Sequence, residues 1–266
     1  MDSRWPLPRI ALVHVLLTND DGILAPGLAA MHRAIRGAAR VTAVAPDTPR
    51  SANAHAITVG DPVAVTRIRT QEGLEGYAVD GQPADCVKLA LRELLDEPAD
   101  LVVSGVNNGA NLGVNVLYSG TIAAAAEGAF FGLPAFAVSL ERGERMDFDR
   151  AAGIAWRVIQ MLYDSTPPGG YLVSVNVPQL SDGRPRGVRV VPQSTTALED
   201  SFRRSTDSRG RACYHLEGAY GDLSGEIDTD LHAVGEGYVA VTPLHFDLTD
   251  RRHLRLLEAT RWPALE

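Results

Sequence analysis

Residues 10–46 read IALVHVLLTNDDGILAPGLAAMHRAIRGAARVTAVAP, and this stretch decides the fold class. Apolar runs at residues 10–17 and 41–45 flank a helical pattern at residues 26–36. Pro26 suits the first turn of a helix, because the N–H that proline lacks has no partner there. The stretch therefore predicts a β-α-β unit.

The same alternation continues along the chain. Strands are predicted at residues 100–104, 135–140, 171–177 and 238–242, and helices at residues 83–95, 121–131 and 148–163. Residues 61–80 contain β-branched stretches of alternating polarity on either side of Glu72-Gly73, and they predict an extra hairpin. Repeated β-α alternation predicts an α/β fold, with a mostly parallel sheet and helices on both faces.

The length of 266 residues favours one domain, residues 1–266, over two equal halves. We expect its core at about residues 10–192, followed by an elaboration and a C-terminal extension at about residues 193–266. Residues 193–230 are polar and Gly-rich with little periodicity, so we expect them to cover the site or a partner subunit. From residue 247 the tail has helical character.

The composition excludes several classes of protein. The chain has 25 Lys and Arg against 33 Asp and Glu, and its basic residues are scattered along the sequence. A nucleic-acid polymer is therefore not expected as a partner. The hydrophobic content of 45% is ordinary for a globular chain, and no membrane association is expected. Cys86 and Cys213 match no ligand or redox spacing, and residues 10–17 lack the features of a signal peptide, so we expect a cytoplasmic protein.

Polar residues follow three of the predicted strands. They lie at residues 18–22, 47–51 and 105–109. In an open parallel sheet, ligands bind beyond the carboxyl ends of the strands. We therefore expect these three loops to meet at one edge and form a site.

The adjacent carboxylates Asp20 and Asp21 are the most informative residues of these loops. Neighbouring carboxylates repel each other, so the pair is costly unless a cation or hydrogen-bond donors neutralise it. Oxygen ligands from Asp, Ser and Asn suit Mg²⁺ or Mn²⁺, and no Cys/His set selects zinc. Turn and helix-capping positions also explain the pair, because Asp and Asn favour them.

Ser119-Gly120-Thr121 precedes an Ala-rich segment and predicts a helix N-terminus. Free N–H groups, hydroxyls and the positive helix end make such a start a seat for phosphate. A plain N-cap, with alanines for close packing, explains it as well. His55 follows the second loop and is a candidate proton donor to a leaving oxygen. The sequence has no Gly-x-Ser-x-Gly elbow and no P-loop, which disfavours a serine hydrolase or an NTPase.

Four ordered motifs connect these loops to a known family. They are LLTNDDGI at residues 16–23, APDTPRS at 45–51, SGVN at 104–107 and YSGT at 118–121. GQPADCV at 81–87, EGYV at 236–239 and TPL at 242–244 extend the pattern over most of the chain. Together they closely resemble the SurE family of 5'/3'-nucleotidases, also called survival proteins.

The resemblance implies a Rossmann-like α/β core and a swapped C-terminal extension in a homodimer or homotetramer. It also implies release of phosphate from nucleoside monophosphates. One divalent metal ion, Mg or Mn, would be held by Asp20, Asp21, Ser51 and Asn107. We expect Asp20, Asp21 and Asn107 to be catalytic. We expect the substrate to be bound by Asn19, Ser119, Gly120 and Thr121.

The chain departs from the family pattern at two places. Ala52 and Ala54 stand where the family usually has Gly and small hydroxyl residues, and Asn115 stands where many members carry Asp. These departures leave two alternatives open: a phosphatase for a specialised phosphorylated metabolite, and a non-catalytic protein that binds metal and nucleotide. The four predicted ligands are all present, which argues against the non-catalytic alternative.

Overall fold

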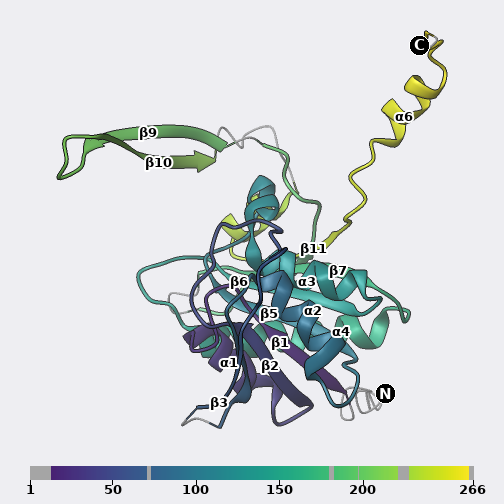
Figure 1. The fold of residues 1–266 in the computed structure, drawn as a ribbon. Helices are drawn as coiled ribbons and strands as arrows, with labels where there is room; N and C mark the ends of the chain where they lie inside the picture. The colour runs from purple at the N-terminus through teal and green to yellow at the C-terminus, as the bar shows by residue number, and fades with distance from the viewer. Residues whose placement is uncertain (1–12, 71–72, 180–182, 197, 221–227, 264–266) are drawn as a thin grey trace.

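A mostly parallel sheet forms the centre of the protein (Figure 1). The computed structural model describes residues 13–70, 73–179, 183–196, 198–220 and 228–263. Within them, nine strands follow the order β3-β4-β2-β1-β5-β6-β7-β11-β8. Their bounds are β1 (His14–Thr18), β2 (Arg40–Pro46), β3 (Val65–Arg69), β4 (Glu75–Val79), β5 (Leu101–Asn108), β6 (Pro134–Leu140), β7 (Tyr171–Val177), β8 (Val188–Val190) and β11 (Val239–Leu244). Only the β3–β4 and β7–β11 pairs of this sheet are antiparallel.

Helices cover both faces of the sheet, as the sequence predicted. The helical segments are α1 (Pro26–Ile35), α2 (Pro83–Leu89), a π-helical turn (Ala90–Leu94), a 3₁₀ helix (Gly113–Tyr118), α3 (Gly120–Phe130), α4 (Phe148–Ser165), α5 (Asp230–Gly235) and α6 (Arg251–Glu258). Strand β1 is buried along its whole length. Its residues alternate between two cores, because successive side chains of a strand point to opposite faces. Val15 and Leu17 pack in the core with α1 and α4, whereas Leu16 packs in the core with α2 and α3.

The sheet has a topological switch point at β1. Strand β1 lies between β2 and β5, both parallel to it, with Leu17 beside Ala43 and Thr18 beside Ser104. The chain turns to one side of β1 through α1 and β2, and β5 later adds to the other side. The loops after β1 and β5 therefore leave the same edge side by side, which is where open α/β sheets bind ligands.

Helix α3 packs very closely on the sheet. Ala124 and Ala125 are fully buried in the core that it shares with the sheet. At Gly128, a Cβ would lie 2.5 Å from Cγ2 of Val102, so the helix axis comes too near for a larger side chain. The small residues of this segment therefore serve close helix-sheet packing.

Most predicted elements are present with small changes of boundary. The hairpin at residues 61–80 is the antiparallel pair β3–β4, and the strand predicted at residues 171–177 is β7. The first strand begins at His14, and residues 10–12 of its predicted range lie outside the described residues. Strand β5 extends four residues beyond the prediction, to Asn108.

Residues 193–230, where the sequence shows little periodicity, contain regular structure. This segment contains the antiparallel strands β9 (Leu198–Thr206) and β10 (Ala212–Tyr220), and the start of α5. The hairpin projects from the body of the molecule, as does α6 (Figure 1). Because the body covers neither face of the hairpin, Phe202, Tyr214 and Leu216 are exposed, and the sequence lacks a simple alternation of apolar and polar residues.

Helix α6 has no buried residue, although Leu254, Leu256 and Leu257 are apolar. A two-stranded hairpin is at best marginally stable by itself in water. The hairpin and α6 therefore both carry apolar residues that no other part of the described chain covers. Across the described residues, no helix is long and apolar enough to span a bilayer.

Candidate functional site

A polar cleft of about 660 Å³ opens at the carboxyl edge of the sheet, beside the switch point. The loops after β1, β2 and β5 line it, together with Ser119 at the start of α3. The four predicted metal ligands, Asp20, Asp21, Ser51 and Asn107, all line this cleft. The fold thus brings together three loops that are far apart in the sequence.

Asp20 is buried against the first turn of α3. Its Oδ1 accepts a hydrogen bond of 2.5 Å from the Thr121 hydroxyl. Gly120 is required beside it, because a Cβ there would lie 2.8 Å from Cβ of Asp20. Burial raises the pKa of Asp20 to about 6, the charge of Asp21 adds to the rise, and the Thr121 bond opposes it. Asp20 is therefore a carboxylate whose charged form needs a counter-ion.

Asp21 and Asn107 are oriented by contacts at the carboxyl end of β5. Oδ2 of Asp21 accepts a hydrogen bond of 3.1 Å from the backbone N–H of Asn108. The side-chain nitrogen of Asn107 donates to the carbonyl of Gly109 at 2.8 Å. Because the side-chain nitrogen is used in this bond, the side-chain oxygen of Asn107 is the atom that could bind a cation. A register shift between Ser104 and Asn107 in the β5–β6 pairing re-aims this part of the strand.

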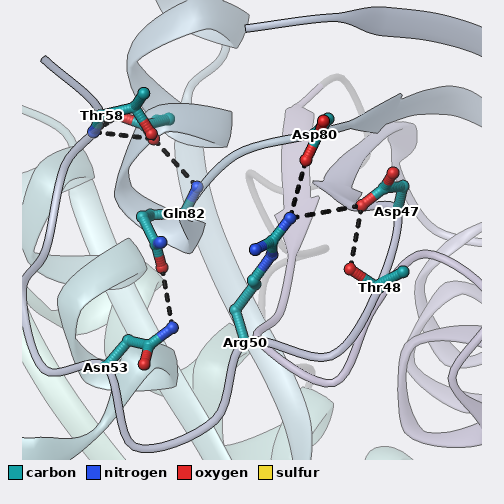
Figure 2. Close-up of polar contacts among 8 residues, drawn as sticks. Asp47, Thr48, Arg50, Asn53, Thr58, Asp80 and Gln82 are labelled. Carbon is teal, nitrogen blue, oxygen red and sulfur yellow. Dashed lines mark hydrogen bonds and ion pairs between the residues drawn. The ribbon is translucent and has the colours of Figure 1, made fainter. Parts of the chain in front are cut away.

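The loop that carries Ser51 is anchored on both sides of this residue. Figure 2 shows the Arg50 guanidinium between Asp80 at 2.7 Å and Asp47 at 3.9 Å. The backbone N–H of Arg50 also donates to the carbonyl of Asp20 at 2.8 Å. Beyond Ser51, the Asn53 side chain donates to Oε1 of Gln82 at 3.0 Å. The position of Ser51 beside Asp20 is therefore fixed by contacts of its neighbours.

Two alanines in this loop adopt the left-handed backbone conformation. The φ angles are +58° at Ala52 and +51° at Ala54. Such angles strain residues that carry a Cβ, and glycine adopts them freely. The position after Ser51, where the resemblance leads one to expect Gly, thus keeps a conformation suited to Gly although Ala occupies it.

The donor atoms at this edge fit one divalent cation. Two carboxylates, a hydroxyl and an amide oxygen are hard ligands, which Mg²⁺ and Mn²⁺ prefer. In the described part of the chain, neither Asp20 nor Asp21 forms an ion pair with Lys, Arg or His. A buried carboxylate beside a second one, without a basic side chain paired to either, fits a site that a cation completes.

Comparison with known proteins assigns the family. The profile of the family described as "Survival protein SurE" matches residues 15–200, which is more than half of the chain. The chain belongs to the SurE family. A protein named 5'-nucleotidase SurE from Moorella thermoacetica is 44% identical over 246 residues, which cover 92% of this chain and 95% of the relative.

Two further SurE proteins agree with this assignment. The 5'-nucleotidase SurE of Rhodopirellula baltica is 45% identical over 238 residues, covering 89% of this chain and 94% of the relative. The crystal structure of the SurE protein from Aquifex aeolicus is 34% identical and superposes with a TM-score of 0.79, covering 92% of this chain and 99% of that one. The α/β fold seen here is thus the SurE fold.

The predicted substrate-binding residues divide into two groups in this SurE protein. Ser119 lines the cleft, and its hydroxyl accepts a hydrogen bond of 3.2 Å from the N–H of Ile122 as the N-cap of α3. Asn19 is fully buried, and its side chain both donates to and accepts from the backbone of Gly22. Thr121 is fully buried on Asp20, and Gly120 provides the room for that contact. The geometry supports direct contact with substrate for Ser119, and a supporting position behind the cleft for the other three.

His55, the candidate proton donor, does not line the polar cleft in this structure. Its Nε2 lies 2.8 Å from Oε1 of the buried Glu127, and its ring stacks on Phe130. Lys88 binds the other oxygen of Glu127 at 2.8 Å. His55 lines an adjoining apolar cleft of about 380 Å³, which shares Ser119 with the polar cleft, and its ring contacts Glu127 and Phe130 of α3.

Sequence reasoning missed Asn111, Tyr118 and Arg142 as residues of the SurE cleft. Asn111 is tied to the sheet through Ser139 and Asn176. Arg142 follows β6 by two residues and donates to the carbonyl of Asn108 at 3.0 Å. The rule that ligands bind at carboxyl ends of strands, applied to the strand at residues 135–140, would have pointed to Arg142.

Proposed function

We propose that this SurE-family protein is a metal-dependent 5'-nucleotidase that releases phosphate from nucleoside 5'- and 3'-monophosphates. The observation that carries the proposal is the meeting of four oxygen ligands beside the N-terminus of α3 in one cleft. The relatives named 5'-nucleotidase SurE support the same activity. Neither the specialised phosphatase nor the non-catalytic protein gains support from these similarities.

Asp20, Asp21, Ser51 and Asn107 would hold one Mg²⁺ or Mn²⁺ ion. Such an ion supplies a Lewis acid that polarises a phosphoryl oxygen and a water molecule. Asp20 is held by Thr121, and Asp21 is held by Asn108 through Oδ2. Asp21 is the less buried of the two carboxylates, which favours it as the residue that orients the attacking water.

The start of α3 would bind the phosphoryl group. The first N–H groups of a helix lack intrahelical partners, and the helix dipole favours an anion there. Ser119 places a hydroxyl at this end and lines the cleft. Because Thr121 of the same turn is bonded to Asp20, the phosphate seat lies directly beside a predicted metal ligand. Asn107, at the carboxyl end of β5, would add its side-chain oxygen to the predicted metal site.

The experiment that tests this function is a substrate panel. Phosphate release is measured from nucleoside 5'- and 3'-monophosphates, from a dinucleoside phosphodiester and from an aryl phosphate, with Mg²⁺, Mn²⁺ or a chelator. We expect release from the nucleoside monophosphates that the chelator abolishes. Metal-bound protein that hydrolyses none of the nucleotides would refute the proposal, and release from the aryl phosphate alone would favour the specialised phosphatase.

We also propose that the protein is a cytoplasmic homodimer or homotetramer. The exposed apolar residues of the β9–β10 hairpin and of α6 support a second copy as their covering. The free thiol of the buried Cys86 and the free Cys213 support a reducing compartment. Light scattering after gel filtration tests the assembly. A mass of 28.5 kDa, that of one chain, would contradict it.

A further inference from the structure

Arg142 brings a positive charge to the polar cleft. It lies two residues beyond β6 and lines the cleft together with Asp20 and Asp21. Among the described residues, it is the only Lys or Arg that lines this cleft. Arg142 lies in none of the SurE-like motifs quoted above.

The guanidinium of Arg142 is held in place by backbone. One NH₂ group donates to the carbonyl of Asn108 at 3.0 Å. The group lies over Gly109, where a Cβ would come within 3.8 Å of that nitrogen and 4.0 Å of Nε. No ion pair with Arg142 is found in the described part of the chain. No carboxylate of the described residues therefore neutralises its charge, and the hydrogen bond to Asn108 uses one of its five N–H donors.

A bound phosphate would bring more negative charge into the cleft than the metal ion and the helix N-terminus balance. Asp20 and Asp21 together balance one divalent ion, so a phosphate monoester would add close to two negative charges at neutral pH. The N-terminus of α3 offers roughly half a positive charge. A guanidinium adds a full charge in a planar fork that matches two phosphoryl oxygens.

We propose that Arg142 binds the phosphoryl group of the substrate and selects dianionic phosphate monoesters over diesters. A diester has a single negative charge and only two unsubstituted oxygens, which the metal and the helix start would occupy. Arg142 then has no charged oxygen left to bind. This inference rests on the proposed function, because it assigns a phosphate to this cleft.

Inorganic phosphate is the probe that separates this role from a purely structural one. Its binding to the Mg²⁺-loaded protein is measured by calorimetry for wild type, Arg142→Ala and Arg142→Lys, and Mg²⁺ binding is measured separately. Arg145→Ala is the matched control, because Arg145 is an exposed arginine of the same loop that does not line the cleft. We expect Arg142→Ala to weaken phosphate binding about tenfold, as for a lost charge-assisted hydrogen bond, with Mg²⁺ affinity unchanged. Arg142→Lys keeps the charge and should lose less.

Unchanged phosphate affinity in Arg142→Ala would overturn the inference. A parallel loss of Mg²⁺ affinity, with normal phosphate binding at saturating Mg²⁺, would also overturn it, because Arg142 would then only brace the loop at Asn108. The two proposals fail differently. Wild type that hydrolyses no ester but binds phosphate through Arg142 refutes the nucleotidase alone, whereas an active enzyme with an unaffected Arg142→Ala variant refutes the role of Arg142 alone.

Discussion

The hydroxyl of Thr121 donates a hydrogen bond of 2.5 Å to Oδ1 of Asp20, deep at the base of the cleft. This contact joins the loop after β1 to the first turn of α3. It places a buried carboxylate next to a helix N-terminus, so a cation and an anion can bind side by side. The proposed metal and phosphate sites are therefore positioned by the same pair of residues.

Removing this contact should change metal binding more than folding. Thr121→Val keeps the shape of the side chain and leaves Oδ1 of Asp20 without its donor. Because the bond lowers the pKa of Asp20, we expect that pKa to rise above about 6 and Mg²⁺ to bind more weakly at pH 7. The loss of stability should be about 1–3 kcal/mol, the cost of an unsatisfied buried group. Calorimetry measures the Mg²⁺ affinity and thermal unfolding measures the stability.

Thr66→Val, on the exposed face of β3, is the control for this substitution. Equal Mg²⁺ affinity in Thr121→Val and wild type would contradict the role of the contact.

The pH dependence of metal binding follows from Asp20. Its pKa is raised in the folded, metal-free protein from 3.8 to about 6, mainly by burial. Because the folded protein binds this proton more tightly than the unfolded chain does, protonated Asp20 adds to the free energy of unfolding. This contribution is complete below pH 3.8 and is lost as the pH rises through about 6. The proton therefore competes with the metal below pH 6, and Mg²⁺ affinity should rise between pH 5 and 7 by up to about tenfold per unit and then level off. Titration calorimetry from pH 5 to 8 measures this. A flat profile, or one that keeps rising steeply above pH 7, would be inconsistent with Asp20 as the controlling group.

The strained loop at Ala52 should accept glycine and reject a larger side chain. At a φ of +58°, Ala52→Gly relieves backbone strain, so stability should stay within about 1 kcal/mol of wild type despite the added entropy of the unfolded chain. Ala52→Val should destabilise the loop by about 1–3 kcal/mol and weaken metal binding through Ser51. Ala56→Val is the control, because Ala56 is exposed and has no positive φ. If Ala52→Val behaved like Ala56→Val in unfolding and metal binding, the strain at Ala52 would have no consequence.

Because α3 packs closely on the sheet, replacing glycine by alanine should change stability in opposite directions in α3 and in α4. Gly128→Ala forces a Cβ against Val102 and should destabilise the protein by about 1–3 kcal/mol. Gly153→Ala lies in α4, where the added Cβ meets nothing within 4 Å, and should stabilise the protein by about 0.5–1 kcal/mol. Chemical unfolding of both variants measures the difference. Two changes of the same sign would be evidence against the packing of α3 on β5.

The sequence predicted most of the core because its signals are local. The apolar run that ends at Leu17 predicted a buried strand. The polar residues from Thr18 onward predicted that the candidate site lies at the carboxyl end of this strand. The Ser119-Gly120-Thr121 start of α3 was found in the same way. Burial, however, is a property of the assembled fold. The side chain of Asn19 is satisfied nearby, at Gly22, but nothing local to Thr121 shows that its hydroxyl binds Asp20, 101 residues away in the sequence.

Three features could not be predicted from the sequence, for related physical reasons. His55 stands in the motif loop, but its direction depends on Glu127, which comes from a distant part of the chain. Arg142 follows the carboxyl end of β6, where the rule on strand ends applies, but its contact with Asn108 depends on β6 lying next to β5. The β9–β10 hairpin contributes no residue to the three apolar clusters of the described chain, so burial did not shape its sequence into a periodic pattern.

The most direct test of the central claim is phosphate release from a nucleoside 5'-monophosphate by Asp21→Asn, measured together with Mg²⁺ binding. Asp96→Asn, which makes the same change at an exposed residue outside the cleft, is the control. The account predicts that Asp21→Asn loses most of its activity and binds Mg²⁺ at least about tenfold more weakly, while Asp96→Asn matches wild type. Full activity of Asp21→Asn with undiminished Mg²⁺ binding would contradict a metal-dependent site at this edge of the sheet.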